Sequence, residues 1–193
     1  MKKVCVFCGS SPGFKPLYKE AAERLADAMA DAGYELIYGG ATVGLMGALA
    51  NRMLERGMHV TGVIPSFFSR AEIAHPSLTS IHYVESMHER KNMMAGLSDG
   101  FIALPGGFGT LDELFEIITW GQLDLHNKPV GILNINGYFD TLSTMFDVMV
   151  AEGFVKKAHH QMILQSDEPV ALLKSMEDYQ PVRLEKWLNR IKS

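Results

Sequence analysis

The chain has 193 residues, of which 47% are hydrophobic and 21% charged, as is ordinary for a globular protein of one domain with its own core. The formal net charge of −4 and the lack of a long basic run argue against nucleic acid as a partner. No apolar run reaches the roughly 18 residues of a membrane span, and no signal-peptide layout opens the chain, so we expect a cytoplasmic protein without a membrane partner.

Apolar strand-like runs alternate with amphipathic helical runs along the chain. In chain order, the pattern predicts a strand over 3–8, a helix over 16–32, a strand over 35–38, a helix over 45–56 and a strand over 59–64. After a longer connection over 65–80 come a strand at 81–84, a helix at 87–97, a strand at 101–104, a helix at 110–123, a strand at 129–135, a helix at 138–152, a strand at 162–165 and one or two terminal helices. Near-continuous apolar strands separated by helices indicate a parallel sheet covered on both faces. The sequence therefore predicts one α/β domain over residues 1–193, doubly wound and Rossmann-like, with a mainly parallel central sheet.

Cys5 and Cys8 form a C-x-x-C string, which in redox proteins normally opens a helix. Here both residues lie in a β-branched apolar run that predicts a strand, and residues three apart on a strand face opposite sides of the sheet. No second cysteine pair completes a zinc site, and the seven histidines show no ligand spacing. Structural burial is therefore favoured over redox or metal chemistry, and we expect no metal ion.

Three glycine-containing loops follow predicted strands: Gly9-Ser10-Ser11, Gly39-Gly40-Ala41-Thr42 and Pro105-Gly106-Gly107-Phe108-Gly109-Thr110. Glycines allow sharp turns and let backbone N–H groups approach an anion at a helix N-terminus. In doubly wound sheets, ligands bind at the carboxyl ends of the strands near a topological switch point. The three loops together predict a nucleotide or phosphate pocket, although a single glycine loop would also be ordinary turn chemistry.

Two common nucleotide motifs are missing or altered. The chain has no G-x-x-x-x-G-K-[ST] string, which argues against a P-loop ATPase. The string Gly107-x-Gly109-x-x-Asp112 begins like a dinucleotide fingerprint but has an acid in place of the third glycine. A monophosphate therefore fits these loops better than NAD.

The string PGGFGTLDE at residues 105–113 resembles the PGGxGTxxE signature of the Lonely Guy (LOG) family, and MHERK at residues 87–91 resembles its M-x-x-R-K motif. The CGSS string at residues 8–11 and the YGG string at residues 38–40 also resemble family positions, and the resemblance runs from the first strand to about His126. It implies a phosphoribohydrolase that releases the free base and ribose 5-phosphate from cytokinin riboside 5′-monophosphates, from AMP or from both. It also implies a homodimer, for which helix 87–97 is a plausible contact surface, and no cofactor.

Matched position by position, the resemblance assigns catalysis to Arg90 and Glu113. The positions that it implies for substrate binding are Gly9, Ser10, Gly39, Gly40, Glu72, Met87, Lys91, Gly106, Gly107, Phe108, Gly109, Thr110 and Thr119. The residues just after Glu72, Ala74-His75-Pro76, depart from the family's usual glycine-containing loop, which bears on the preferred base.

The chemistry of glycosidic cleavage suits these residue types. The reaction passes through an oxocarbenium-like ribosyl cation, so it needs a carboxylate near the ribose and donors on the phosphate. We expect Glu113 in the first turn of its helix, where the helix dipole favours an ionised carboxylate. The backbone N–H groups of residues 107–110 would hold the phosphate, and Arg90 would clamp the phosphate or steer the ribose through its planar fork.

Simpler interpretations of the same residues stay open. The string Thr110-x-x-Glu113 also matches a capping box, in which the glutamate only accepts a backbone N–H. Arg90 and Lys91 match a solvated helix face, and Asp112 most simply complements the helix dipole.

Two other functions are also compatible with this fold. One is a non-catalytic carrier of a nucleotide or of molybdenum cofactor, because fold does not determine function. The other is lysine decarboxylation, a label often given to this family, which would need pyridoxal phosphate on a lysine. No lysine stands in a recognisable Schiff-base context.

Overall fold

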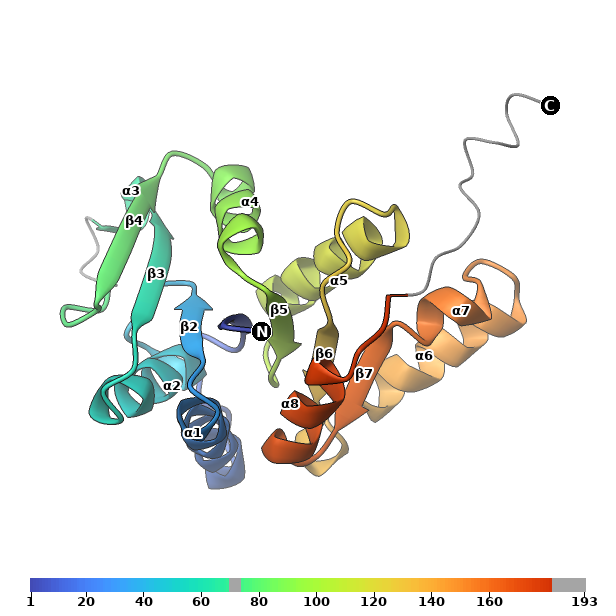
Figure 1. The fold of residues 1–193 in the computed structure, drawn as a ribbon, viewed down its shortest axis with the longest axis horizontal. Helices are drawn as coiled ribbons and strands as arrows, with labels where there is room; N and C mark the ends of the chain where they lie inside the picture. Colours follow the sequence, from blue (N-terminus) through green and yellow to red (C-terminus); the bar gives the residue numbers. More distant parts are fainter. Residues whose placement is uncertain (70–73, 182–193) are drawn as a thin grey trace.

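A seven-stranded sheet with the order β4-β3-β2-β1-β5-β6-β7 forms the centre of the protein (Figure 1). The computed structural model describes residues 1–69 and 74–181. Its strands are β1 (Lys3–Phe7), β2 (Glu35–Tyr38), β3 (Val60–Pro65), β4 (Ser80–Val84), β5 (Gly100–Ala103), β6 (Val130–Leu133) and β7 (Ile163–Ser166). Its helices are α1 (Pro16–Asp31), α2 (Gly44–Glu55), α3 (Ser66–Ser69), α4 (Met87–Leu97), α5 (Phe108–Gln122), the 3₁₀ turn η1 (Ile135–Gly137), α6 (Asp140–Ala151), α7 (Lys157–His160) and α8 (Pro169–Glu177).

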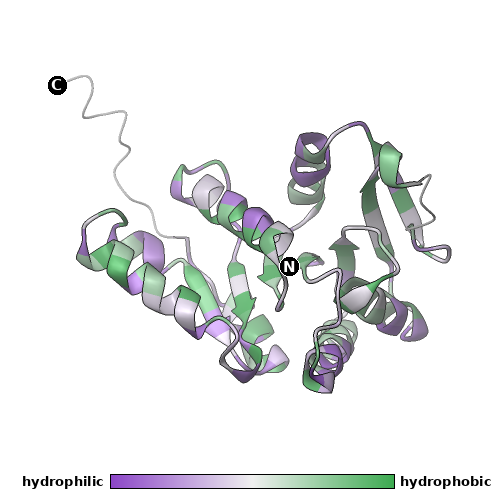
Figure 2. Ribbon diagram, turned by 180° about the vertical axis from the view of Figure 1, so that it is seen from behind, coloured by the Kyte–Doolittle hydropathy of each residue, from purple (hydrophilic) through white to green (hydrophobic). Residues whose placement is uncertain are grey.

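Both faces of the sheet are covered by helices (Figure 1). Along β1, Val4 and Val6 belong to the apolar cluster that includes α1, α2 and α8, whereas Cys5 and Phe7 belong to the cluster that includes α4, α5 and α6. Figure 2 shows the same arrangement, with mostly apolar strands between helices that also carry polar residues. Cys8 lies in the cluster opposite to that of Cys5, and both thiols are free and buried, which confirms the structural interpretation of the C-x-x-C string.

The predicted α/β, Rossmann-like class is confirmed, and the sheet predicted as mainly parallel is parallel in every pairing of the described chain. Two differences bear on the site: α5 begins at Phe108 rather than at Thr110, and Tyr138 precedes α6 instead of opening it. The short helices α3 and α7 were not predicted. Of the expected terminal helices, α8 is present, and residues 182–193 lie outside the described residues.

The two differences have local causes. Gly107 has an extended backbone and is the N-cap of α5, so the helix starts as soon as the Pro105-Gly106-Gly107 segment ends. Before α6, Asn136 and Gly137 take left-handed conformations (φ 54° and 67°), which end the preceding turn and delay the helix.

The order of the strands sets where a ligand can bind. The chain runs outward from β1 through β2, β3 and β4, then returns to place β5 on the other side of β1. The loops after β1 and β5 therefore leave the sheet in opposite directions, which creates the switch-point crevice typical of doubly wound folds. None of the helices in the described part of the chain is long and apolar enough to cross a membrane.

Candidate active site

A cavity of about 520 Å³ lies where β1, β2, β3 and β5 end. Of the residues expected at the site, those that line this cavity are Ser10, Gly39, Met87, Arg90, Gly107, Phe108, Gly109, Thr110 and Glu113. They come from three loops and from α4 and α5, so the cavity collects segments that are distant in sequence. Its place at the switch point is the place where such folds bind nucleotides.

Arg90 on α4 and Glu113 on α5 form a buried ion pair in the wall of the cavity. Arg90 donates from Nη1 to Oε1 of Glu113 at 2.6 Å and from Nε to the carbonyl oxygen of Val63 at 3.1 Å. The two residues are only 8% and 9% exposed. The interpretation of Arg90 as part of a solvated helix face is therefore wrong, because its guanidinium is held inside the protein by two directed hydrogen bonds.

The loop after β2 makes room for the guanidinium. A Cβ atom added at Gly39 would overlap Nη2 of Arg90 and would lie 3.1 Å from Sδ of Met46. Residue 39 must therefore lack a side chain if Arg90 is to keep its position. This close approach explains in physical terms why a glycine follows β2.

The N-termini of α2 and α5 both border the cavity. The N-cap residues Val43 and Gly107 line it, and neither helix has a side-chain cap or an acidic residue in its first turn. The first N–H groups of a helix have no intrahelical acceptor, and the helix dipole adds partial positive charge there. At α2, the Leu45 N–H already donates to the carbonyl oxygen of Gly9 at 3.0 Å. The N-terminus of α5 is therefore the better place for an anion such as a phosphate.

Glu113 does not occupy the first turn of α5, contrary to the expectation from the sequence. With Gly107 as the N-cap, Thr110 lies inside the helix and Glu113 in its second turn. The capping box is therefore not formed, and the Glu113 carboxylate instead accepts from Arg90. The reason is the early start of α5 at Phe108, which moves every later residue further from the helix N-terminus.

Burial raises the pKa of Glu113 above its ordinary value, and the Arg90 guanidinium acts in the opposite direction. The nearby Asp112 carboxylate raises the pKa further, while Lys91 lowers it. Burial and the ion pair, rather than a helix dipole, are thus the main influences on the charge of this carboxylate.

Comparisons with known proteins agree on the family. The family model described as "Possible lysine decarboxylase" matches residues 46–176. A probable cytokinin riboside 5′-monophosphate phosphoribohydrolase of Oryza sativa subsp. japonica is 48% identical over 177 residues, which are 92% of this chain and 79% of that protein. A cytokinin riboside 5′-monophosphate phosphoribohydrolase of Arabidopsis thaliana is 45% identical over 180 residues, 93% of this chain and 83% of that protein. The chain belongs to the LOG family.

Solved structures share the fold of this LOG-family protein at low identity. The molybdenum cofactor carrier protein of Chlamydomonas reinhardtii matches with a TM-score of 0.70 and 20% identity, covering 92% of this chain and 99% of that chain. A likeness at this identity concerns the fold alone.

The residues of the cavity do not fit the cofactor that a lysine decarboxylase would need. Pyridoxal phosphate is held as a Schiff base on a lysine. Among the residues of the described chain that line the cavity, none is a lysine.

Lys91, expected as a substrate contact, forms ion pairs with two carboxylates of α5. Its Nζ lies 3.1 Å from Asp112 Oδ2 and 3.1 Å from Glu116 Oε2, and its side chain is only 12% exposed. Lys91 is absent from the described cavity lining, whereas Asp112 is part of it. Asp112 therefore pairs with Lys91 rather than complementing the dipole in the first turn of α5.

Of the remaining expected residues, Gly9, Gly40 and Gly106 belong to the loops beside the cavity but are not part of its described wall. The loops after β1 and β5 are joined by the hydrogen bond from Gly9 N to Pro105 O (3.1 Å), with Gly106 beside them, and Gly40 O accepts from His75 N (2.9 Å). Thr119 is exposed and donates to the carbonyl oxygen of Phe115, well along α5. Glu72 lies outside the described residues.

The cavity is also lined by residues that were not among the expected site residues. They are Cys8, Ala41, Val43, Met46, Ile64, Pro65, Phe68 and Asp112. Most are apolar and lie at or just beyond the carboxyl ends of strands, where the switch-point rule predicts a ligand site. Apart from Asp112, they add apolar surface to the cavity wall.

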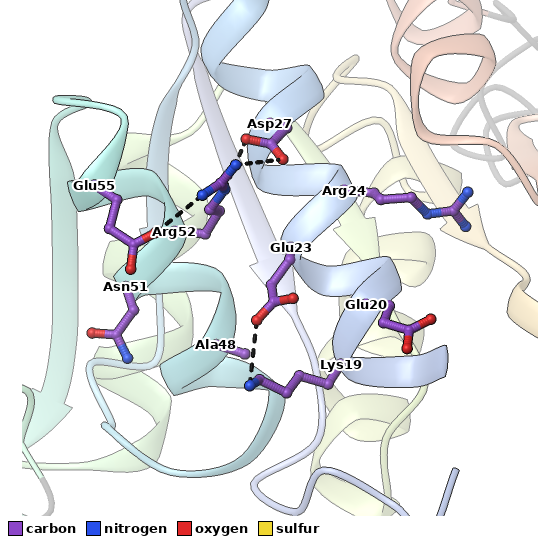
Figure 3. A pocket seen from close by; sticks show the side chains of 9 residues that line it. All are labelled: Lys19, Glu20, Glu23, Arg24, Asp27, Ala48, Asn51, Arg52 and Glu55. Carbon is purple, nitrogen blue, oxygen red and sulfur yellow. Dashed lines mark hydrogen bonds and ion pairs between the residues drawn. The ribbon is translucent and has the colours of Figure 1, made fainter. Parts of the chain in front are cut away.

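A second hollow, of about 570 Å³, lies between α1 and α2 (Figure 3). Five of its seven charged side chains pair with one another, Lys19 with Glu23 and Arg52 with Asp27 and Glu55, and Arg24 pairs with Glu168. The hollow lies away from the strand ends and the glycine loops, so its size alone does not make it a candidate site.

Proposed function

We propose that this LOG-family protein hydrolyses the N-glycosidic bond of a nucleoside 5′-monophosphate, namely a cytokinin riboside 5′-monophosphate, AMP or both. The observation that carries the proposal is the buried Arg90–Glu113 pair beside the N-terminus of α5, which has no side-chain cap. The names of the relatives that are 45–48% identical support the same reaction. The C1′–N9 bond breaks with its electron pair on the base, water oxygen bonds to C1′, and the base gains the proton that the water loses, giving free base and ribose 5-phosphate.

Each part of the cavity suits one part of this substrate. The N–H groups at the start of α5, at residues 107–110, would bind the 5′-phosphate. Glu113 would stabilise the positive charge that develops on the ribose or orient the attacking water. Arg90 holds the Glu113 carboxylate in place and can present its remaining donors to the phosphate or ribose.

The base would lie against the apolar surface of the cavity wall. Met46, Ile64, Phe68 and Met87 provide flat and flexible apolar surface of the kind that accepts a purine ring. The same surface would accept an N6-prenyl group, so the proposal includes both adenine and prenylated adenine as the released base.

The test is chromatographic detection of free base after incubation with AMP and isopentenyladenosine monophosphate in parallel. Release from either substrate supports the proposal, and the ratio of rates ranks the two. The variant Glu113→Gln should abolish release, while the control Glu23→Gln, at an exposed ion pair with Lys19, should not. Wild-type turnover by Glu113→Gln would remove the assigned role, and tight binding of AMP without release would favour the nucleotide carrier.

We further propose that the protein works as a homodimer in the cytoplasm. Helix α4 is a weaker candidate for the contact than its methionines suggest, because Met94 is buried and Met93 packs on the protein's own core. Exposed apolar side chains are instead found at the end of α5 and along and after α6, at Leu123, Leu125, Met145, Val148 and Phe154. Sedimentation that finds only monomer would reject the dimer.

Free buried cysteines fit a reducing compartment such as the cytoplasm. Fractionation of cells tests the compartment.

A further inference from the structure

Tyr138 makes a hydrogen bond that no motif indicated. Its hydroxyl donates to the carbonyl oxygen of Gly106 at 2.7 Å. Gly106 belongs to the glycine loop after β5, whereas Tyr138 follows β6 and is 32 residues away in sequence. Because β5 and β6 are neighbours in the sheet, their carboxyl ends meet at one edge and the phenol can reach the neighbouring loop.

The turn that carries Tyr138 is held at several points. The Asn134 side chain accepts from the backbone N–H of Phe139 at 2.7 Å and donates to Asp140 at 2.7 Å. A Cβ atom at Gly137 would lie 2.5 Å from the Asp140 carboxylate, and its φ of 67° also favours glycine. This bracing places Tyr138 reproducibly, so its bond to Gly106 is built into the fold.

Aromatic rings support the phenol from the side. The Tyr138 ring meets the ring of Tyr18, on α1, edge to face with centroids 5.8 Å apart, and it meets Phe139 in the same manner at 5.1 Å. Such contacts restrict the ring to one orientation. The ring, which is 44% exposed, is thus supported by two aromatic contacts while its hydroxyl bonds to Gly106.

The hydrogen bond determines which way one peptide unit of the glycine loop faces. In a trans peptide, the C=O of one residue and the N–H of the next point in opposite directions, and the described chain contains no cis peptide bond. With the Gly106 oxygen turned toward Tyr138, the N–H of Gly107 must point away from Tyr138. Gly107 lines the cavity and Gly106 does not, so this direction is toward the ligand space.

We propose that Tyr138 is a positioning residue for phosphate binding, which keeps the Gly106–Gly107 peptide oriented with its N–H available to the 5′-phosphate. The inference rests on the proposed function, because it takes the start of α5 as the phosphate site. Without the tyrosine hydroxyl, the peptide unit between two glycines can rotate at low cost. A rotated unit would present a carbonyl oxygen to the phosphate and repel it.

The test compares Tyr138→Phe with the wild-type protein and with Tyr18→Phe. The control removes the hydroxyl of the adjoining ring, for which no hydrogen bond is found among residues 1–69 and 74–181. Calorimetry measures the affinity of each protein for AMP and for adenosine, which lacks the phosphate. We expect Tyr138→Phe to weaken AMP binding by about three- to tenfold, the worth of one hydrogen bond, with adenosine binding unchanged and Tyr18→Phe normal for both.

Several outcomes would overturn the inference. Unchanged AMP affinity in Tyr138→Phe would do so, and so would an equal loss for AMP and adenosine, which indicates a merely structural role. A wild-type protein with no preference for AMP over adenosine would also overturn it, because the loop would then hold no phosphate. Base release by the wild type is measured separately. AMP binding without release would reject the proposed hydrolysis. The comparison of AMP with adenosine would still decide the role of Tyr138.

Discussion

The guanidinium of Arg90 occupies the space in which residue 39 would carry its side chain. Gly39 directly follows the parallel strand β2, and Arg90 reaches it from α4, on one face of the sheet. The same guanidinium is bound at Val63 and Glu113, so it cannot retreat without losing a hydrogen bond. The position of the Arg90 side chain thus depends on the absence of a Cβ atom at Gly39 as much as on the ion pair with Glu113.

Gly39→Ala should therefore disable the site while leaving the fold in place. The added methyl group overlaps Nη2 of Arg90 and must displace the guanidinium. We expect kcat/KM to fall by about 100-fold, the usual effect of a misplacement near 1 Å. The control is Gly96→Ala on α4, where a Cβ atom meets nothing within 4 Å. Equal activity of the two variants would contradict this account.

The dependence of kcat/KM on pH at acidic pH should reflect the ionisation of Glu113. Burial raises the pKa of Glu113, and the opposing effect of Arg90 is smaller. The carboxyl therefore ionises at a pH above its ordinary pKa of 4.5. If the carboxylate form is the working one, kcat/KM should rise with pH through an ionisation higher than that value. Kinetics of the wild type between about pH 4 and pH 8 measure it. An acid limb at or below the ordinary value would contradict the prediction.

The same shift has a consequence for stability. A carboxyl whose pKa is higher in the folded than in the unfolded protein favours folding most at low pH, and this contribution is lost as pH rises from the unfolded to the folded pKa. Replacing Glu113 by Gln should remove that part of the pH dependence. Tm of wild type and variant across the same pH range gives the comparison, and parallel curves would show that burial does not perturb this group.

Removing the cation alone should destabilise the protein. Arg90→Met leaves the Glu113 carboxylate buried without a partner, which costs about 3–5 kcal/mol for a buried pair. The double variant Arg90→Met, Glu113→Gln should lose less stability than the sum of the two single changes, because no uncompensated charge remains. Arg24→Met breaks only an exposed pair with Glu168 and should cost about 0–1 kcal/mol. Unfolding in denaturant measures the free energy of unfolding of each variant. If the losses of the two single variants simply add in the double variant, Arg90 and Glu113 do not stabilise each other.

Lys91→Met distinguishes two roles for this lysine. Because Lys91 is not part of the described cavity wall and pairs with Asp112 and Glu116 of α5, its loss should mainly loosen α4 from α5 and lower Tm slightly. We expect kcat/KM to change by less than about tenfold, the equivalent of roughly 1.4 kcal/mol. The control is Lys19→Met at an exposed pair with Glu23. A much larger rise in the KM for AMP would instead support direct contact with the substrate.

Much of the architecture was predictable because local patterns encode it. Apolar runs and helical periodicity located every described strand and the helices α1, α2, α4, α5 and α6 to within about two residues, whereas α8 was expected only as a terminal helix without bounds. Period-two alternation placed Cys5 and Cys8 on opposite faces, as found. The two motifs identified Arg90 and Glu113 as partners, and the glycine loops indicated the strand ends at which the cavity lies.

What the sequence by itself determined, then, is the class of fold, the positions of its elements and the residue types gathered at the strand ends. The tertiary structure alone decided that Arg90 touches Glu113, that Lys91 is taken up by two carboxylates, and that Tyr138 bonds to Gly106. These contacts depend on the strand order, which puts β5 between β1 and β6. Residue periodicity describes one element at a time, whereas the neighbours of a strand are selected by the packing of the whole sheet.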